Sequence, residues 1–258
     1  MERVQRYIDG YTSSDFNFYD LESWWKVSEI NPDIELNIRK IGDFKIVVAD
    51  NFLLNPDGFR DFLKKFPGFP NSQRQLMSRP GFSQKLHPEL FRHFEFLIKE
   101  NYNEDRKESG LDEQYLNFTW ATNIMHSDMK LYRNSEIPHF DTFTSFVMNY
   151  WMCEGVNDSS ISFYEFDGNK KHLWNDEECD KNYNEWRSDY HDSHEIGSWG
   201  NFKCDNRWKK YYSSKVKYNR AVFYDPYFYH CPSIKPNSYI NDYRYSLVGF
   251  GKDVSVAY

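Results

Sequence analysis

The chain has 258 residues, of which 19% are aromatic, and it carries a formal net charge of −7 at pH 7. This acidic balance argues against strong nucleic-acid binding, because non-specific affinity for DNA or RNA comes mainly from neutralising phosphates. The length fits a single domain over residues 1–258, and the 20 Tyr and 22 Phe favour a β-rich fold.

The four cysteines are widely spaced and contain no C-x-x-C pair, which is typical of reduced intracellular thiols. The first residues lack an apolar leader, and no run approaches the roughly 18 apolar residues of a membrane span. We therefore expect a cytoplasmic protein with no membrane partner.

The first 110 residues predict a helix-rich N-terminal support. Ile41 to Ala49 is a strand candidate. Asn55-Pro56-Asp57 then starts a helix with apolar residues at i, i+3, i+4 and i+7 from Phe59, which ends at Phe66 before Pro67. A second helix is expected from Pro88 to Tyr102.

Residues 111–258 change to short β-branched and aromatic runs. The predicted strands are Asn117–Met125, Thr142–Met152, Ser159–Phe166, Val216–Tyr224 and Arg244–Phe250. The fold class is therefore mainly β with flanking helices, around a double-stranded β-helix (jelly-roll) core.

A polar segment, residues 167–215, interrupts these strands. Long segments of this kind inside a compact domain are usually functional. Four tryptophans (174, 186, 199 and 208) favour a folded insertion over disorder. We expect a lid that borders the active-site mouth and governs substrate choice; the alternative is that the tryptophans only cover the outside of the barrel.

Three residues have the types that hold a catalytic iron. His139 and Asp141 are one residue apart in front of a long predicted strand, and His230 follows the strand that ends at Tyr224. Two imidazoles and one carboxylate form a facial triad, which binds Fe(II) on one side and leaves positions open for a co-substrate and O₂. Either histidine in isolation would be an ordinary structural residue.

A second pair predicts the co-substrate. Arg244 and Ser246 share one face of a strand, where a guanidinium and a hydroxyl form a pocket for a distal carboxylate. This pair favours a keto acid, whereas an isolated arginine between two tyrosines is most simply an ion-paired surface residue.

Other histidine and cysteine arrangements compete with this interpretation. His126 and Asp128 form another H-x-D, whose simpler explanation is a strand histidine in or near the core. His191 and His194 lie in a polar segment without the helical H-E-x-x-H frame of a zinc site. No basic partner in the sequence marks a cysteine as a nucleophile.

The ordered combination resembles the Fe(II)/2-oxoglutarate-dependent dioxygenases, in particular their prolyl-hydroxylase-like branch. The resemblance rests on Pro138-His139-Phe140-Asp141, on the segment 219–230 and on the segment 243–250, and it covers about the last half of the chain. Residues 46–56 are a weaker match to the strand-then-helix opening of that branch.

The resemblance implies that His139, Asp141 and His230 bind iron and that Arg244 and Ser246 bind the distal carboxylate of 2-oxoglutarate. It also suggests Tyr150, since members of this branch often place a tyrosine against that carboxylate. The implied reaction couples decarboxylation of 2-oxoglutarate by O₂ to hydroxylation of a small-molecule or peptidyl substrate. The rival from another class is a non-catalytic jelly-roll that binds a ligand or protein; a keto-acid-independent cupin-type dioxygenase is a second rival.

Overall fold

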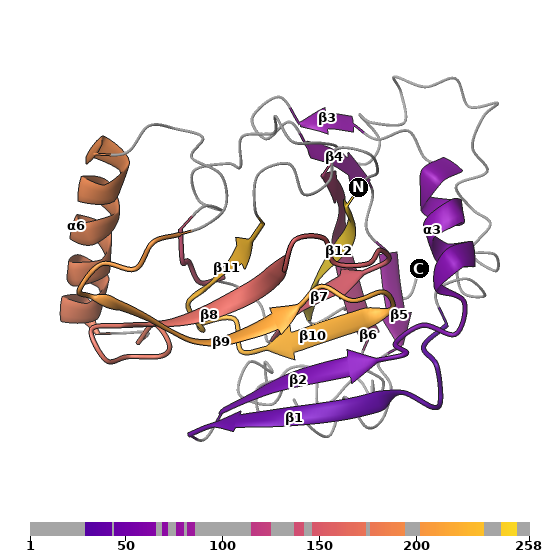
Figure 1. The fold of residues 1–258 in the computed structure, drawn as a ribbon, viewed down its shortest axis with the longest axis horizontal. Helices are drawn as coiled ribbons and strands as arrows, with labels where there is room; N and C mark the ends of the chain where they lie inside the picture. The colour runs from indigo at the N-terminus through magenta and orange to yellow at the C-terminus, as the bar shows by residue number, and fades with distance from the viewer. Residues whose placement is uncertain are drawn as a thin grey trace, which may run out of the picture.

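Two antiparallel sheets build most of the protein (Figure 1). The computed structural model describes residues 29–42, 44–65, 69–71, 76–79, 82–85, 115–124, 137–141, 146–173, 176–193, 202–234 and 244–251. Within these residues the fold is mainly β with few helices, as the sequence predicts.

The larger sheet contains nine strands among the described residues. Its order is β1 (Glu35–Ile41), β2 (Phe44–Asp50), β10 (Arg220–Tyr224), β7 (Phe146–Trp151), β12 (Arg244–Gly251), β6 (Tyr115–Ile124), β4 (Leu76–Arg79) and β3 (Phe69–Asn71), with β5 (Phe82–Lys85) also paired to β6. Segments far apart in sequence thus meet, since β12 lies between β6 and β7.

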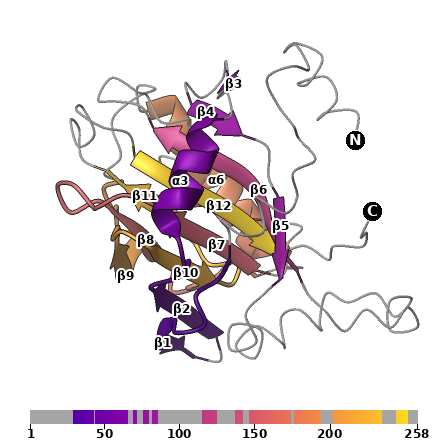
Figure 2. The same cartoon turned by 90° about the vertical axis from the view of Figure 1, so that its right-hand side faces the viewer.

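The smaller sheet has the order β11 (His230–Ser233), β8 (Ser160–Phe166) and β9 (Trp208–Lys215). Apolar side chains of both sheets pack together between them, and Figure 2 shows this second layer of strands beside the first. The shared core contains Val147, Trp151, Val222 and Tyr224 from the larger sheet, and Ile161 and Phe163 from the smaller one. Side chains of a strand alternate between its two faces, so every second residue of β7, β8 and β10 points into this interior.

The first predicted strand is wrong in its bounds, because residues 41–49 contain a turn. Gly42 has φ of 60° between β1 and β2, and the two strands pair from Ile41↔Phe44 to Glu35↔Asp50. A glycine adopts this left-handed conformation without the steric cost of a Cβ. The run is therefore a hairpin at the edge of the large sheet.

The strand expected at 216–224 begins at Arg220, four residues later than predicted, because a turn precedes it. Asn219 has φ of 56°, and the Arg220 amide N–H donates to the Lys217 carbonyl, which closes a turn before β10. The other predicted strands match β6, β7, β8 and β12 to within a few residues, although 142–145 lie outside the described residues.

The expected first helix is α3 (Pro56–Lys65), whose Phe59 is fully buried. The Gly58 amide N–H donates to Asn55 Oδ1 at 2.9 Å, which caps the first turn. The second expected helix, 88–102, lies outside the described residues. In the described part of the first 110 residues, strands β1 to β5 join the large sheet.

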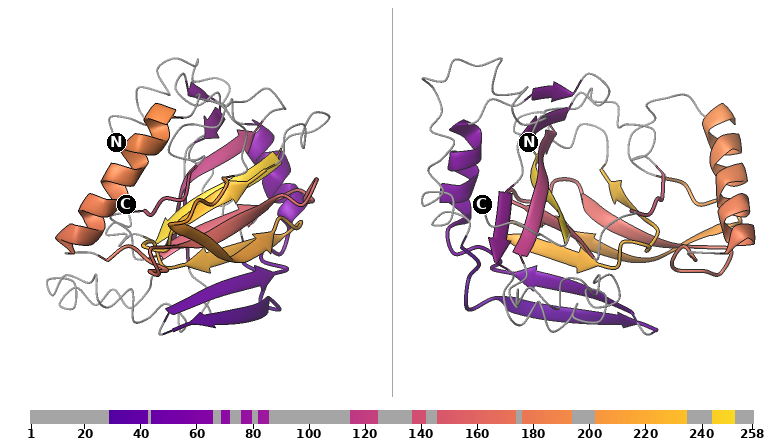
Figure 3. Two further views of the ribbon diagram at one scale, coloured as in Figure 1. Left: turned by 60° about the vertical axis from the view of Figure 1, so that its left-hand side comes forward. Right: turned by 180° about the vertical axis from the view of Figure 1, so that it is seen from behind.

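The interrupting segment 167–215 contains α6 (Glu177–Ser193) and ends in β9, so its last part belongs to the small sheet. Figure 3 shows α6 and α3 on opposite sides of the strands. The four cysteines are free thiols. None of the helices in the described segments is long and apolar enough to cross a membrane.

Candidate metal centre

A pair of backbone hydrogen bonds joins His139 directly to His230. Each amide N–H donates to the carbonyl of the other residue, at 3.0 and 2.8 Å, so the two residues lie opposite each other in an antiparallel bridge. Opposed residues in such a bridge project to the same face, and their rings lie 4.5 Å apart. The Asp141 N–H donates to the Pro226 carbonyl at 2.8 Å, a second contact between the two segments that lies outside the register of this bridge.

The side chains of His139, Asp141 and His230 converge on one point. One nitrogen or oxygen atom from each residue lies within 4.8 Å of the others, and His230 Nε2 is 3.4 Å from Asp141 Oδ2. Ligand bonds of about 2.1 Å leave donor atoms of one ion roughly 3 Å apart, so small side-chain rotations would complete a ligand set. The structure thus brings together the three residues that the sequence singles out.

Both imidazoles carry a backbone partner on the nitrogen that faces away from this point. His139 Nδ1 lies 3.0 Å from the Ile137 carbonyl, and His230 Nδ1 lies 2.9 Å from the Phe228 carbonyl. A carbonyl only accepts, so each Nδ1 carries a hydrogen, which leaves Nε2 as the nitrogen that can bind a metal ion when the ring is neutral. Such an outer hydrogen bond orients a metal-ligating histidine.

The electrostatics of the site also suit a cation. Burial, together with the charge of His139, holds the pKa of His230 well below its usual range, so this imidazole is neutral. Burial raises the pKa of Asp141, and the charge of His139 opposes that shift. A divalent ion would offset the desolvation cost that this carboxylate carries when it is charged.

Tyr224 and Asn149 line the interior next to the centre, and the sequence reasoning missed both. The Tyr224 ring lies 4.8 Å from the His230 ring, and its hydroxyl accepts a 2.7 Å hydrogen bond from Asn149 Nδ2. Desolvation and the negative charge of Asp141 raise the pKa of Tyr224. Alternation within β10 could have placed Tyr224 on one face with Val222, which is the interior face.

Arg244 and Ser246 lie on β12, at alternate positions of one strand. Ser246 pairs with Trp151 of β7 and is almost fully buried on the interior face. In the described part of the chain, the buried Trp151 Nε1 has no hydrogen-bond partner. The position of Arg244, opposite Ile124, shares this face of the strand with Ser246.

The structure places Tyr150 apart from the other residues predicted to bind the co-substrate. Asn149 and Trp151 face the interior, so Tyr150 between them points to the opposite face of the large sheet. Its hydroxyl bonds to Asn219 Oδ1 at 3.1 Å, and its ring contacts Phe52 at a centroid distance of 5.2 Å. Tyr150 is therefore part of the core beneath α3.

The described part of the insertion lies behind the centre and does not cover it. Phe140 points away from the two ligands that flank it and stacks on His172, with ring centroids 3.8 Å apart. Tyr183 of α6 donates to the Pro138 carbonyl at 3.0 Å. Trp186 and Trp208 belong to the same buried cluster, whereas Trp174 and Trp199 lie outside the described residues.

The competing histidine arrangements fall in other parts of the chain. His126, Asp128 and His194 lie outside the described residues, and so does the side chain of His191. Among the described residues, His139, Asp141 and His230 are the one group of His, Cys, Asp and Glu side chains with metal-site geometry.

Comparison with known proteins identifies one family. Residues 32–244 match the model of DUF6445, described as a family of unknown function. No curated protein and no solved structure matches the chain.

Proposed function

We propose that this chain, which belongs to the DUF6445 family, is an Fe(II)- and 2-oxoglutarate-dependent oxygenase that hydroxylates its substrate. The observation that carries the proposal is the convergence of His139, Asp141 and His230, with Nε2 of each histidine as the nitrogen that can bind a metal ion. This donor set matches the facial triad of non-haem iron oxygenases and lacks the thiolates typical of structural zinc sites.

We infer that the two facing sheets form a double-stranded β-helix core. The inference is supported by the large sheet contributing β12 and the small sheet contributing β11, with the interior core between them. In that arrangement the ligands stand at one end of the interior, and Ser246 lies deeper within it. A keto acid bound at the ligands would extend along the interior toward β12.

Iron and 2-oxoglutarate would supply the oxidising chemistry by activating O₂. The residues of the chain would hold the ion and orient both organic reactants. His139 and His230 would each offer an imidazole Nε2 donor, while Asp141 would supply the single negative charge. Asp141 retains 23% side-chain exposure against 6% for His230, so the open side of the centre is beside the carboxylate.

The co-substrate pocket would be formed by polar groups of the interior face. Asn149 pairs with Val248, and Ser246 pairs with Trp151 two residues further along β7, a step of about 7 Å along a strand. A bound carboxylate there would accept hydrogen bonds from Ser246 and from Trp151 Nε1, whose N–H is otherwise buried without a partner among the described residues. Arg244 at the start of the strand would supply the positive charge.

We further propose that the substrate is a small molecule or a peptidyl side chain and that the protein acts in the cytoplasm. The net charge of −7 supports a substrate other than nucleic acid.

The test is turnover of 2-oxoglutarate. Protein loaded anaerobically with Fe(II) and then exposed to O₂ should release succinate from 2-oxoglutarate, slowly when no substrate is added. Asp141→Ala should abolish this release, while Tyr150→Phe, on the other face of the sheet, should retain it. Iron binding without any keto-acid consumption would instead favour a binding module or a keto-acid-independent dioxygenase.

A further inference from the structure

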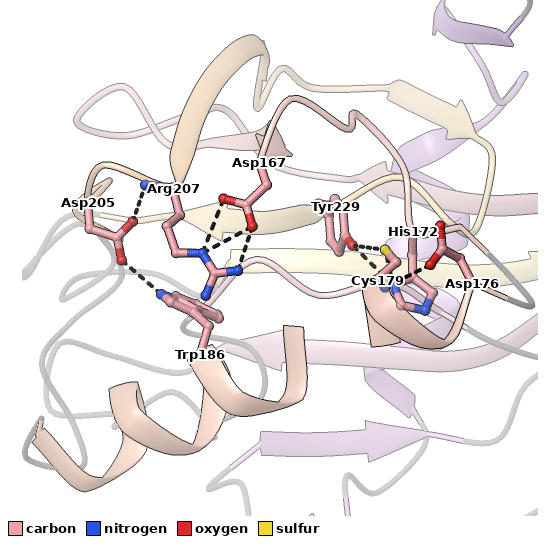
Figure 4. Close-up of polar contacts among 8 residues, drawn as sticks. All are labelled: Asp167, His172, Asp176, Cys179, Trp186, Asp205, Arg207 and Tyr229. Atoms are coloured by element: carbon pink, nitrogen blue, oxygen red, sulfur yellow. Dashed lines mark hydrogen bonds and ion pairs between the residues drawn. The ribbon is translucent and has the colours of Figure 1, made fainter. Parts of the chain in front are cut away.

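We propose that His172 is a positioning residue that sets the geometry of the metal centre from the face opposite the ion. The proposal rests on the proposed function only in taking His139, Asp141 and His230 as the metal ligands. His172 belongs to the insertion and is 1% exposed. Figure 4 shows it beside Tyr229 and Cys179, at the start of α6.

The imidazole of His172 contacts both segments that carry ligands. On one side its ring stacks on Phe140, which lies between His139 and Asp141, at 3.8 Å and an interplanar angle of 6°. On the other side its Nδ1 lies 3.0 Å from the hydroxyl of Tyr229, the residue before His230. One side chain thus bridges two chain segments that are about ninety residues apart in sequence.

The backbone around His172 reinforces this bridge. Its amide N–H donates to the Tyr227 carbonyl at 2.8 Å, and Lys171 forms a β-bridge with Phe228. The segment that leads to His230 therefore lies between two neighbours: residues 139–141 on one side and residues 171–172 on the other.

The orientation of the ring is fixed by Asp180 of α6. His172 Nε2 lies 2.6 Å from Asp180 Oδ1, and a carboxylate can only accept, so Nε2 carries the hydrogen. Nδ1 is then the acceptor, and the Tyr229 hydroxyl donates to it. Cys179 lies close to this pair, with Sγ 3.7 Å from the hydroxyl and 3.8 Å from Nδ1.

Strand geometry links this outer cluster to the ligands. Phe140 and Tyr229 point outward, whereas the adjacent ligand residues, His139 and Asp141 beside Phe140 and His230 beside Tyr229, point inward. A tilt of either outer ring would therefore turn the donor atoms on the other face. A chain of hydrogen bonds from Asp180 through His172 to Tyr229 resists such a tilt. Outer residues that orient ligands typically affect metal affinity by about 10- to 100-fold.

The experiment compares Co(II) binding by the wild type and variants of the full chain. His172→Phe keeps a flat ring against Phe140 but removes both hydrogen bonds, and it should raise the Kd for Co(II) by about ten-fold or more. The visible absorption spectrum of bound Co(II), which reports ligand geometry, should also change. Asp180→Asn changes a side chain that is 57% exposed and keeps an acceptor oxygen for His172 Nε2. This variant should retain most of the wild-type Co(II) affinity and the wild-type spectrum.

Trp186→Phe is the matched control, because Trp186 belongs to the same outer cluster but its Nε1 bonds to Asp205, away from the ligands. This variant should lower the thermal unfolding temperature while leaving the Kd and spectrum unchanged. If His172→Phe and Trp186→Phe altered Co(II) binding equally, His172 would be only a packing residue. Unchanged binding in His172→Phe would overturn the positioning role alone, whereas wild-type protein that binds no Co(II) would overturn the metal site as well.

Discussion

His139 and His230 are joined by two reciprocal backbone hydrogen bonds, of 3.0 and 2.8 Å, that place their imidazoles side by side. The backbone pairing thus fixes the distance between the two Cα atoms, and only side-chain rotation of the two histidines adjusts the spacing of their Nε2 atoms. Asp141 enters the same centre because alternation returns it to the face of His139. The convergence of the three candidate ligands therefore follows from the backbone pairing of the His139 segment with His230.

Arg244→Lys should weaken 2-oxoglutarate binding more than metal binding. A guanidinium can pair both oxygens of a carboxylate, and an ammonium cannot reproduce that geometry. We expect the Kd for 2-oxoglutarate to rise roughly ten-fold, equivalent to about 1.4 kcal/mol, with the Kd for Mn(II) nearly unchanged. Calorimetric titration of each ligand checks this, and equal effects on both, or none, would show that the assigned role is wrong.

Tyr224→Phe and Tyr150→Phe should separate the two faces of the large sheet. Both hydroxyls are deeply buried, but Tyr224 bonds to Asn149 beside His230 while Tyr150 bonds to Asn219 beneath α3. We expect Tyr224→Phe to reduce 2-oxoglutarate affinity or turnover with little change in metal affinity. Tyr150→Phe should instead lower the free energy of unfolding by about 1 kcal/mol, the usual net value of one hydrogen bond. If Tyr150→Phe instead reduced 2-oxoglutarate affinity and Tyr224→Phe only lowered stability, Tyr150 would belong to the co-substrate pocket.

Asn219→Ala should be among the most destabilising single changes in the described residues. The Asn219 side chain accepts from the Leu53 N–H and the Tyr150 hydroxyl and donates to the Leu53 carbonyl, and its backbone has φ of 56°. Loss of these buried bonds should lower the free energy of unfolding by about 3 kcal/mol.

Asn219→Gly is the control for backbone strain, because glycine adopts a positive φ freely. It should be about 1 kcal/mol more stable than Asn219→Ala. Urea unfolding of both variants measures the difference, and equal stabilities would mean that the left-handed backbone is not under strain.

The ion pair between Asp50 and Arg220 should make stability depend on acid pH. Arg220 contacts both carboxylate oxygens, at 2.6 and 2.8 Å, and its hydrogen bonds are the main reason that the pKa of Asp50 is lowered. A lowered folded-state pKa contributes stability above the unfolded pKa of about 3.9 and loses it as the pH falls through the folded value. The stability difference between the wild type and Asp50→Asn should thus shrink from pH 6 toward pH 3, and a constant difference would contradict the prediction.

The sequence predicts which three side chains converge better than it predicts their surroundings. His139, Asp141 and His230 could be selected because ligand chemistry restricts the residue types and because each adjoins a strand. The face that Tyr150 takes is not readable from the sequence because β7 is buried on both faces, with Phe146 and Trp151 alike hidden. Without hydrophobic alternation, nothing in the sequence of that strand indicates which face a residue takes.

The helix α6 was missed because its sequence is polar. Nevertheless, Cys179, Tyr183 and Trp186 recur at helical spacing and are buried, and Asp176 Oδ1 accepts from the Cys179 N–H as an N-cap. This signal was present in the sequence but was concealed by the surrounding charges. The position of α6, on the outward side of the segment around Phe140, depends on long-range packing. The periodicity of the sequence does not encode such packing.

The most direct test of the oxygenase proposal is a crystal structure of the protein with Mn(II) and 2-oxoglutarate. We predict one ion bound by His139 Nε2, His230 Nε2 and an Asp141 oxygen, chelated by the keto acid, with the distal carboxylate at Arg244 and Ser246. An ion bound elsewhere, or a 2-oxoglutarate molecule that does not contact the ion, would contradict the account.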